Sequence, residues 1–326
     1  MITKGKIAAI LIAAIALIGL VLVMFQLDRW LTKPWEGDSG DGAHTVYIDG
    51  VAYEPREITN YLIIGLDEFG TVAEDGNGSY NNTKNGDFLA LLSFNHSTKT
   101  YTLLHLNRDT MATVTRLGIG GEKVDERVEQ LALAHTYGNG SHISCRNTAT
   151  AVSGLLYGLS IDYYISMTMD AVAILNDYMG GVTVKVTDDL SELHPDFVQN
   201  SEVTLTGEQA LLYVRARQGI EDGSNLSRMG RQRQYMDAFI KQVRTQDLSE
   251  EYFGGMYEAV MDYIVTNASL QTMDVVLEDL QTYTYGGMLS PQGEARKNDQ
   301  TGFIEFYVDG EHIKSIVKAW YYEERK

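Results

Sequence analysis

The chain has 326 residues, of which 44% are hydrophobic and 21% are charged, enough for one large domain or two small ones. Its formal net charge of −18 argues against a general nucleic-acid-binding protein, because such proteins present a basic face to phosphate. The single cysteine, Cys145, excludes an intrachain disulfide and a cysteine-based metal site, and we expect it to be an ordinary, partly buried residue.

The N-terminal segment predicts a membrane anchor. Residues 7–25 carry no charge, and this length just spans a hydrocarbon core of about 30 Å. Lys4 and Lys6 precede the segment, which favours a cytoplasmic N-terminus. A cleaved signal peptide is the competing interpretation, but no small-x-small cleavage site follows the long apolar run. We therefore expect a cytoplasmic N-terminus, a single transmembrane helix, a linker and an extracytoplasmic domain, over residues 1–6, 7–26, 27–46 and 47–326.

Segments of strand length and of helix length alternate after the linker. An Asp49-Gly50 turn predicts a first hairpin. Strands are expected over 60–66, 87–95, 100–107, 161–167 and 182–186. Helices are expected over 124–137, 147–158, 169–179, 206–214, 227–244, 250–266, 269–281 and 310–322. Apolar strands between helices predict one α/β domain whose sheet is covered on both faces.

Charged residues stand at the ends of three predicted strands. Asp67 follows the first strand, Asp87 begins the second, and Arg108 follows the third. A hairpin that joins the last two strands places Asp87 opposite Arg108. If the first strand is antiparallel to the second, Asp67 reaches the same sheet edge. The alternative is that both aspartates merely end strands.

Five arginines lie within nineteen residues of this acidic chain, at positions 215, 217, 228, 231 and 233. Guanidinium groups are suited to binding phosphate or carboxylate through paired donors. The apolar stripe of the helix predicted over 227–244 extends back to Gln232 and Arg228, so we expect both to point inward. An anionic ligand would offset the unfavourable interaction of Arg228 with the helix dipole. A buried arginine paired with a core aspartate is the alternative, and we assign Arg231 and Arg233 mainly to structure or the rim.

The shorter helix before this cluster has a capping-box signal at Thr206 and Gln209. Arg215 and Arg217 at its end lie on one side if the chain is extended there and diverge if it is helical. Solvated surface arginines are the alternative. The sequence contains no nucleophile elbow, phosphate loop, dinucleotide fingerprint or HExxH motif, and we expect His105 to be a core residue.

Taken together, these motifs resemble the LytR-CpsA-Psr (LCP) family of Gram-positive envelope proteins. Six elements match in order: Tyr61–Asp67, Asn85–Phe88, Asn107–Thr110, Asp177–Val182, Leu205–Arg217 and Arg228–Gln232. The resemblance implies an α/β fold with a central mixed sheet covered by helices on both faces. It also implies a transferase that moves an anionic glycopolymer from an undecaprenyl-pyrophosphate carrier onto peptidoglycan, with no nucleic acid as partner.

The resemblance also implies roles for particular residues. Asp67 and Asp87 would organise Mg²⁺, and the polyprenyl tail would lie in an apolar groove among the helices. The catalytic residues would be Asp87, Arg108, Arg215 and Arg217. The pyrophosphate would be bound by Arg108, Arg127, Arg215, Arg217, Arg228 and Gln232.

Two positions depart from the family pattern. Asn107 replaces the usual proline, and Gln130 replaces the usual lysine, with Arg127 just upstream as its substitute. Two other functions are alternatives, of which the first would use the same site. One is a polyprenyl-pyrophosphate pyrophosphatase, in which water attacks, and the other is a non-catalytic envelope protein that binds glycan or regulates.

Overall fold

The computed structural model describes residues 45–70, 73–74, 80–118, 120–216, 225–246 and 249–325. The predicted membrane anchor over 7–26 and most of the predicted linker lie outside these residues. Within the described part of the chain, no helix is long and apolar enough to cross a membrane.

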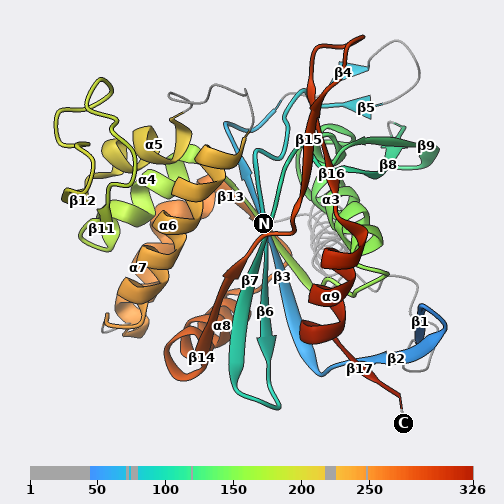
Figure 1. The fold of residues 1–326 in the computed structure, drawn as a ribbon. Helices are drawn as coiled ribbons and strands as arrows, with labels where there is room; N and C mark the ends of the chain where they lie inside the picture. The colour runs from blue at the N-terminus through green and yellow to red at the C-terminus, as the bar shows by residue number, and fades with distance from the viewer. Residues whose placement is uncertain are drawn as a thin grey trace, which may run out of the picture.

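A six-stranded sheet forms the centre of the molecule (Figure 1). Its strands lie in the order β13 (Ile264–Thr266), β10 (Tyr163–Thr168), β3 (Ile58–Leu66), β6 (Phe88–Asn95), β7 (Thr100–Leu106) and β14 (Thr284–Leu289). The β10–β3 and β14–β7 pairs are parallel, and the other neighbours are antiparallel. The expected mixed sheet is therefore confirmed, as are the four predicted strands within it.

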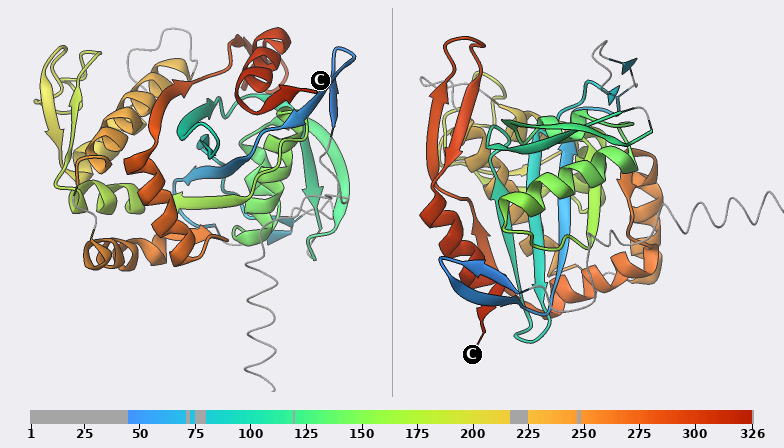
Figure 2. Two further views of the ribbon diagram at one scale, coloured as in Figure 1. Left: turned by 90° about the horizontal axis from the view of Figure 1, so that it is seen from below. Right: turned by 90° about the vertical axis from the view of Figure 1, so that its right-hand side faces the viewer.

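Helices cover both faces of this sheet, as predicted (Figures 1 and 2). On one face, Leu62 and Ile64 of β3 belong to a core shared with α3 (His142–Leu155) and α9 (Gly310–Trp320). On the other, Tyr61 of β3 packs in a core with side chains of the helices α6 and α8. The helices on that second side are α4 (Met169–Tyr178), α5 (Gly207–Arg215), α6 (Leu226–Val243), α7 (Glu250–Val260) and α8 (Leu270–Thr282).

Smaller strand groups surround the central sheet. The predicted Asp49-Gly50 turn is confirmed, since both residues have positive φ, 53° and 79°, between paired strands. The groups are β1 (Val46–Ile48), β2 (Val51–Pro55) and β17 (Tyr322–Glu324); β4 (Ala73–Glu74) and β5 (Tyr80–Asn81); β8 (Met111–Leu117) and β9 (Lys123–Gln130); β11 (Val182–Lys185) and β12 (Glu202–Leu205); and β15 (Gly293–Lys297) and β16 (Ile304–Val308).

Two helix predictions are wrong. The segment 124–137 forms mainly strand β9, followed only by the short helix α2 (Leu133–Thr136). Pairing with β8 fixes this segment as a strand, because it aligns Arg116 with Asp125 in a two-bond ion pair at 2.6 and 2.9 Å. The helix predicted over 250–266 ends at Val260, and its last three residues, Ile-Val-Thr, form the edge strand β13.

Candidate functional site

Asp87 and Arg108 meet at one end of the central sheet. The β6–β7 pairing reaches Leu89 and Leu106, so the next residues outward on the two strands also approach one another. Asp87 Oδ1 forms an ion pair with Arg108 Nη1, and the two side chains are only 16% and 17% exposed. The geometry expected from the hairpin is therefore confirmed.

The guanidinium of Arg108 is held at two of its three nitrogens. Its Nη1 is paired with Asp87, and its Nε donates to Asp109 Oδ1 at 3.2 Å. Among the described residues, Nη2 has no hydrogen-bond partner. Arg108 can therefore offer one fixed edge with free N–H groups to an anion.

Asp67 and Arg215 form a second, more exposed ion pair at the same sheet edge. Asp67 Oδ1 lies 3.3 Å from Arg215 Nη2, and both side chains are more than half exposed. Antiparallel pairing of β3 with β6 brings Asp67 to the edge where Asp87 lies, as expected. The predicted capping box at Thr206 starts α5, and this helix ends at Arg215.

The predicted path beyond Arg215 is only partly described. Ala216 has extended backbone angles (φ −51°, ψ 129°), so the helix does not continue through it. Arg217 lies outside the described residues, and its predicted role stays a prediction.

The first turns of α6 bring two further predicted ligands inward. Arg228 and Gln232 are each 7% exposed, which confirms the orientation expected from the helix stripe. Arg228 Nε donates to Asn225 Oδ1 at 2.8 Å, and Asn225 Nδ2 donates to Asn107 Oδ1 at 3.4 Å. The side-chain amide of Asn225 thus links Arg228 to Asn107, the residue that precedes Arg108.

Arg231 has a structural role, in agreement with its assignment from the sequence. Its side chain is 1% exposed, and Nη1 contacts Asp188 Oδ2 at 2.8 Å. Its Nη2 donates to the backbone oxygen of Ala216. Arg231 therefore ties α6 to the segment that follows α5.

Arg127 is placed away from this charged cluster. It lies on the β8–β9 ribbon, is 54% exposed, and its Nε contacts Asp125 Oδ2 at 3.4 Å. Within the part of the chain described, it contacts none of the other predicted ligands, and its role as a phosphate ligand stays a prediction. Gln130, on the same strand, instead donates to Asp109 Oδ1 at 3.2 Å.

Residues that sequence reasoning passed over complete the site. Asp109 is 9% exposed and contacts both Arg108 and Gln130. Asn225 links Arg228 to Asn107. Asp109 had a local signal, since it directly follows Arg108, whereas the contact that brings Asn225 to the site joins it to Asn107, 118 positions away.

His105 is a neutral core residue beside this site. It is 1% exposed, and its ring lies 4.8 Å from that of Phe88. Burial, together with the smaller effect of the positive charges of Arg233 and Arg228, lowers the pKa of His105 to about 3. The predicted core assignment of His105 is confirmed. Cys145, expected to be partly buried, is fully buried, and burial raises the pKa of its thiol to about 12.

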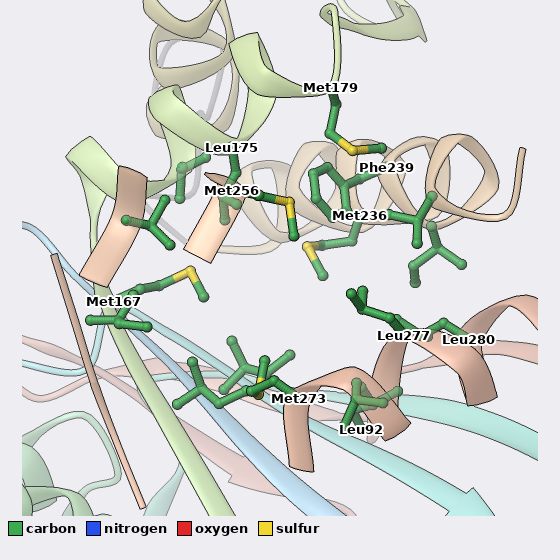
Figure 3. Close-up of a pocket in the computed structure, with 18 of the residues that line it drawn as sticks. Leu92, Met167, Leu175, Met179, Met236, Phe239, Met256, Met273, Leu277 and Leu280 are labelled. Atoms are coloured by element: carbon green, nitrogen blue, oxygen red, sulfur yellow. The ribbon is translucent and has the colours of Figure 1, made fainter. Parts of the chain in front are cut away.

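An apolar groove lies between the sheet and the helices α4, α6, α7 and α8 (Figure 3). It encloses about 240 Å³. Gly65 and Phe88 line one part of it, and both are close in sequence to the carboxylates of Asp67 and Asp87. Their contact is so tight that a Cβ added to Gly65 would lie 2.8 Å from Cβ of Phe88. Other lining residues include Leu92, Met167, Leu175, Met179, Met236, Phe239, Met256, Met273, Leu277 and Leu280.

The charged edge could hold a divalent metal only with help from a ligand. Among the described residues, no group of three or more His, Cys, Asp or Glu side chains is arranged to hold a metal ion. Asp67 and Asp87 nevertheless supply hard oxygen donors at one edge. Mg²⁺ is commonly bound by one or two carboxylates together with phosphate oxygens and water. Both carboxylates are ion-paired with arginines in this structure, and their role in holding Mg²⁺ stays a prediction.

Comparison with known sequences gives a family and named relatives. A model of the LytR_cpsA_psr family matches residues 37–320. The chain is 30% identical over 237 residues to a Halalkalibacterium halodurans protein named polyisoprenyl-teichoic acid--peptidoglycan teichoic acid transferase TagU, covering 73% of this chain and 68% of that protein. It is 28% identical to the Bacillus licheniformis protein of the same name, covering 65% of this chain. The match spans 60% of that relative's length, less than two thirds.

Solved structures have the same fold. Bacillus subtilis TagV superposes with a TM-score of 0.62 at 19% identity, covering 81% of this chain and 96% of that chain. A structure described as TagT bound to LIIa-WTA gives a TM-score of 0.60 at 22% identity, covering 80% of this chain and 89% of that chain. At these identities the likeness establishes a shared mixed α/β architecture.

Proposed function

The chain belongs to the LytR-CpsA-Psr family, and from that membership we propose that it is a membrane-anchored phosphotransferase that attaches an anionic glycopolymer to peptidoglycan. The proposed donor is the polymer linked to a polyprenyl pyrophosphate such as undecaprenyl pyrophosphate. One observation carries the proposal: the ion-paired edge formed by Asp87 and Arg108 adjoins an apolar groove. A donor with a charged head and an apolar tail needs both features side by side.

The arginines are proposed to bind the pyrophosphate and to stabilise charge as it leaves. An acceptor hydroxyl attacks the phosphorus that carries the glycopolymer, a new P–O bond forms, and the bond to polyprenyl phosphate breaks. Arg108 offers the free N–H groups of Nη2, and Arg215 lies exposed nearby at the same edge. Charge stabilisation of this kind is commonly the largest single contribution to catalysis.

A carboxylate at the same edge is proposed to handle the proton of the acceptor. Asp87 orients the attacking hydroxyl and accepts its proton, a role that requires reach of about 3 Å to the acceptor oxygen. Arg228, Gln232 and Arg217 are proposed as further pyrophosphate ligands. Mg²⁺, held by Asp67 and Asp87 with phosphate oxygens, would offset negative charge on the pyrophosphate.

The apolar groove is proposed to hold the polyprenyl tail. Five of its lining residues are methionines, whose unbranched side chains adapt to irregular apolar shapes: Met167, Met179, Met236, Met256 and Met273. Anchoring in the membrane would keep the groove close to a lipid-linked donor and so raise its effective concentration.

The test is a reconstituted reaction with the full-length protein in detergent. Purified protein is mixed with a polyprenyl-pyrophosphate-linked glycopolymer and peptidoglycan fragments. We expect polymer–peptidoglycan phosphodiester and free polyprenyl phosphate in equal amounts. Release of polyprenyl phosphate at the same rate without acceptor would instead identify a pyrophosphatase. Donor binding without turnover, under any acceptor or metal condition, would support a regulatory protein.

A further inference from the structure

We propose that Gln130 and Asp109 are positioning residues, through which the β15–β16 hairpin fixes the guanidinium of Arg108 for anion binding. The inference deepens the proposed function and rests on it in one respect, the assignment of Arg108 as a ligand of the donor's pyrophosphate. It concerns residues that do not themselves touch the donor.

Gln130 connects two distant parts of the chain through one nitrogen. Its Nε2 donates to Asp109 Oδ1 at 3.2 Å and to the backbone oxygen of Ile304 at 2.6 Å. Ile304 begins β16, which lies 174 positions further along the chain. Both N–H groups of this amide are therefore engaged inside the protein.

This geometry argues against Gln130 as a direct phosphate ligand. A phosphate oxygen is an acceptor and needs a donor, and the donors of Gln130 are already used. Its remaining polar atom, Oε1, is an acceptor and would repel an anion. These contacts suit Gln130 to positioning Asp109 rather than to binding an anion.

Asp109 is held at one carboxylate oxygen, at its backbone N–H and at its backbone oxygen. Its Oδ1 accepts from Gln130, its backbone oxygen accepts from Phe306 N at 2.8 Å, and its backbone N–H donates to Asn107 Oδ1 at 3.0 Å. An isolated parallel bridge between Thr110 and Phe306 continues the contact. Figure 1 shows β15 and β16 standing beside β8 and β9 at the end of the sheet. The hairpin thus buttresses Asp109.

Fixing Asp109 fixes Arg108. Arg108 Nε donates to the same Asp109 Oδ1 that Gln130 contacts, while Nη1 pairs with Asp87. A planar guanidinium anchored at two nitrogens has one orientation, so Nη2 is presented in a constant direction. Loss of the Gln130 contact frees Asp109 to rotate, and the guanidinium would then lose one of its two anchors. Misplacement of a catalytic group by about 1 Å can cost about a hundredfold in rate.

The experiment compares Gln130→Ala and Gln130→Glu with a matched control, Gln199→Ala. Gln199 also donates its amide to a backbone oxygen, that of Thr187, but on an exposed loop. In the full-length protein we expect both Gln130 variants to lower kcat by about tenfold or more and to weaken inhibition by inorganic pyrophosphate. The melting temperature and the activity of Gln199→Ala should match the wild type.

The pH profile of Gln130→Glu separates positioning from general stability. The introduced carboxylate faces Asp109, with Arg108 and Asp87 beyond it, and cannot donate while it is ionised. Its protonated form can donate to Asp109 again. The activity of this variant relative to the wild type should therefore rise as the pH falls, whereas that of Gln130→Ala should stay flat.

Other results would overturn the inference. The inference fails if Gln130→Ala has the same kcat as the wild type and is inhibited by pyrophosphate to the same extent. If that variant unfolds, Asp109→Leu, which is similar in size and has no acceptor for Arg108 Nε or Gln130 Nε2, must show the same kinetic loss. If the wild type transfers no polymer, the proposed function fails. Pyrophosphate binding then tests the positioning role alone, and equal affinity in wild type and Gln130→Ala would reject it.

Discussion

Asp87 and Arg108 form an ion pair across the open end of the β6–β7 hairpin, where both side chains are largely buried. The pair neutralises one charge of each sign, yet the guanidinium keeps Nη2 free of partners among the described residues. Such an arrangement can receive an anion without first breaking its own contacts.

Arg108→Lys should lower kcat/KM for polymer transfer by about a hundredfold or more. A lysine ammonium is a single point and cannot contact Asp87, Asp109 and a phosphate oxygen in one plane as the guanidinium does. Steady-state kinetics with the purified full-length protein measures the effect. Near-normal kcat/KM would show that charge alone is sufficient and that the planar geometry is dispensable.

Arg215→Ala should remove activity but leave stability intact. The Arg215–Asp67 pair is more than half exposed on both sides, so its loss should change the free energy of unfolding by less than about 1 kcal/mol. Transfer should fall by about a hundredfold, because a charge-stabilising donor is lost. The control is Arg231→Ala, which removes a buried guanidinium from Asp188 and Ala216 and should cost about 3 kcal/mol. Denaturant unfolding and transfer assays on both variants measure these effects. Normal transfer by Arg215→Ala, or a loss of stability in it as large as that of Arg231→Ala, would contradict the prediction.

Met236→Trp should fill part of the apolar groove and weaken binding of donors with long tails. The cavity holds about 240 Å³, so an added indole competes directly with a prenyl chain. We expect KM to rise by about tenfold for a long-chain donor and little for a short-chain analogue. Val275→Trp is the matched control, because Val275 lies on α8 but is 48% exposed. Equal KM values for both donors would indicate that the tail lies elsewhere.

Stability should fall in mild acid because two buried histidines resist protonation. Burial lowers the pKa of His105 from 6.5 to about 3 and that of His135 to about 4. The unfolded chain therefore binds more protons than the folded one below pH 6.5, and stability is lost as the pH falls towards the folded values. For His105 the loss at pH 5 is about 2 kcal/mol.

The measurement is the free energy of unfolding of wild type and His105→Leu at pH 7 and pH 5. Nδ1 of His105 has no hydrogen-bond partner among the described residues, so leucine removes no hydrogen bond at that atom. The variant should lose about 2 kcal/mol less than the wild type between these pH values. An identical pH dependence would mean that His105 is protonated equally in both states.

Sequence patterns predicted the parts of the fold that depend on local signals. Apolar runs of strand length predicted β3, β6 and β7, and the hairpin between the last two placed Asp87 opposite Arg108. The helix stripe of α6 placed Arg228 and Gln232 inside. In each case the contact follows from neighbours within one element or one hairpin.

The rest depends on contacts between distant segments. β9 carries mostly charged, exposed side chains, so only its partner β8 fixes it as a strand. No local sequence pattern predicts the hydrogen bond from the Gln130 side chain to the backbone oxygen of Ile304, 174 positions away. The same holds for β14, which joins the sheet beside β7 through a register shift between Tyr285 and Met288.

Helix α6 carries Arg228 and Gln232 in its first turns and Met236, Phe239 and Ile240 on the groove further along. A single helix thus sets both the distance and the rotation about its axis between the polar side chains and the side chains that line the apolar groove. A single residue inserted between Gln232 and Tyr235 would turn one half by about 100° against the other. A ligand that binds both at Arg228 and in the apolar groove must therefore match the distance and the orientation that α6 sets between these two sites.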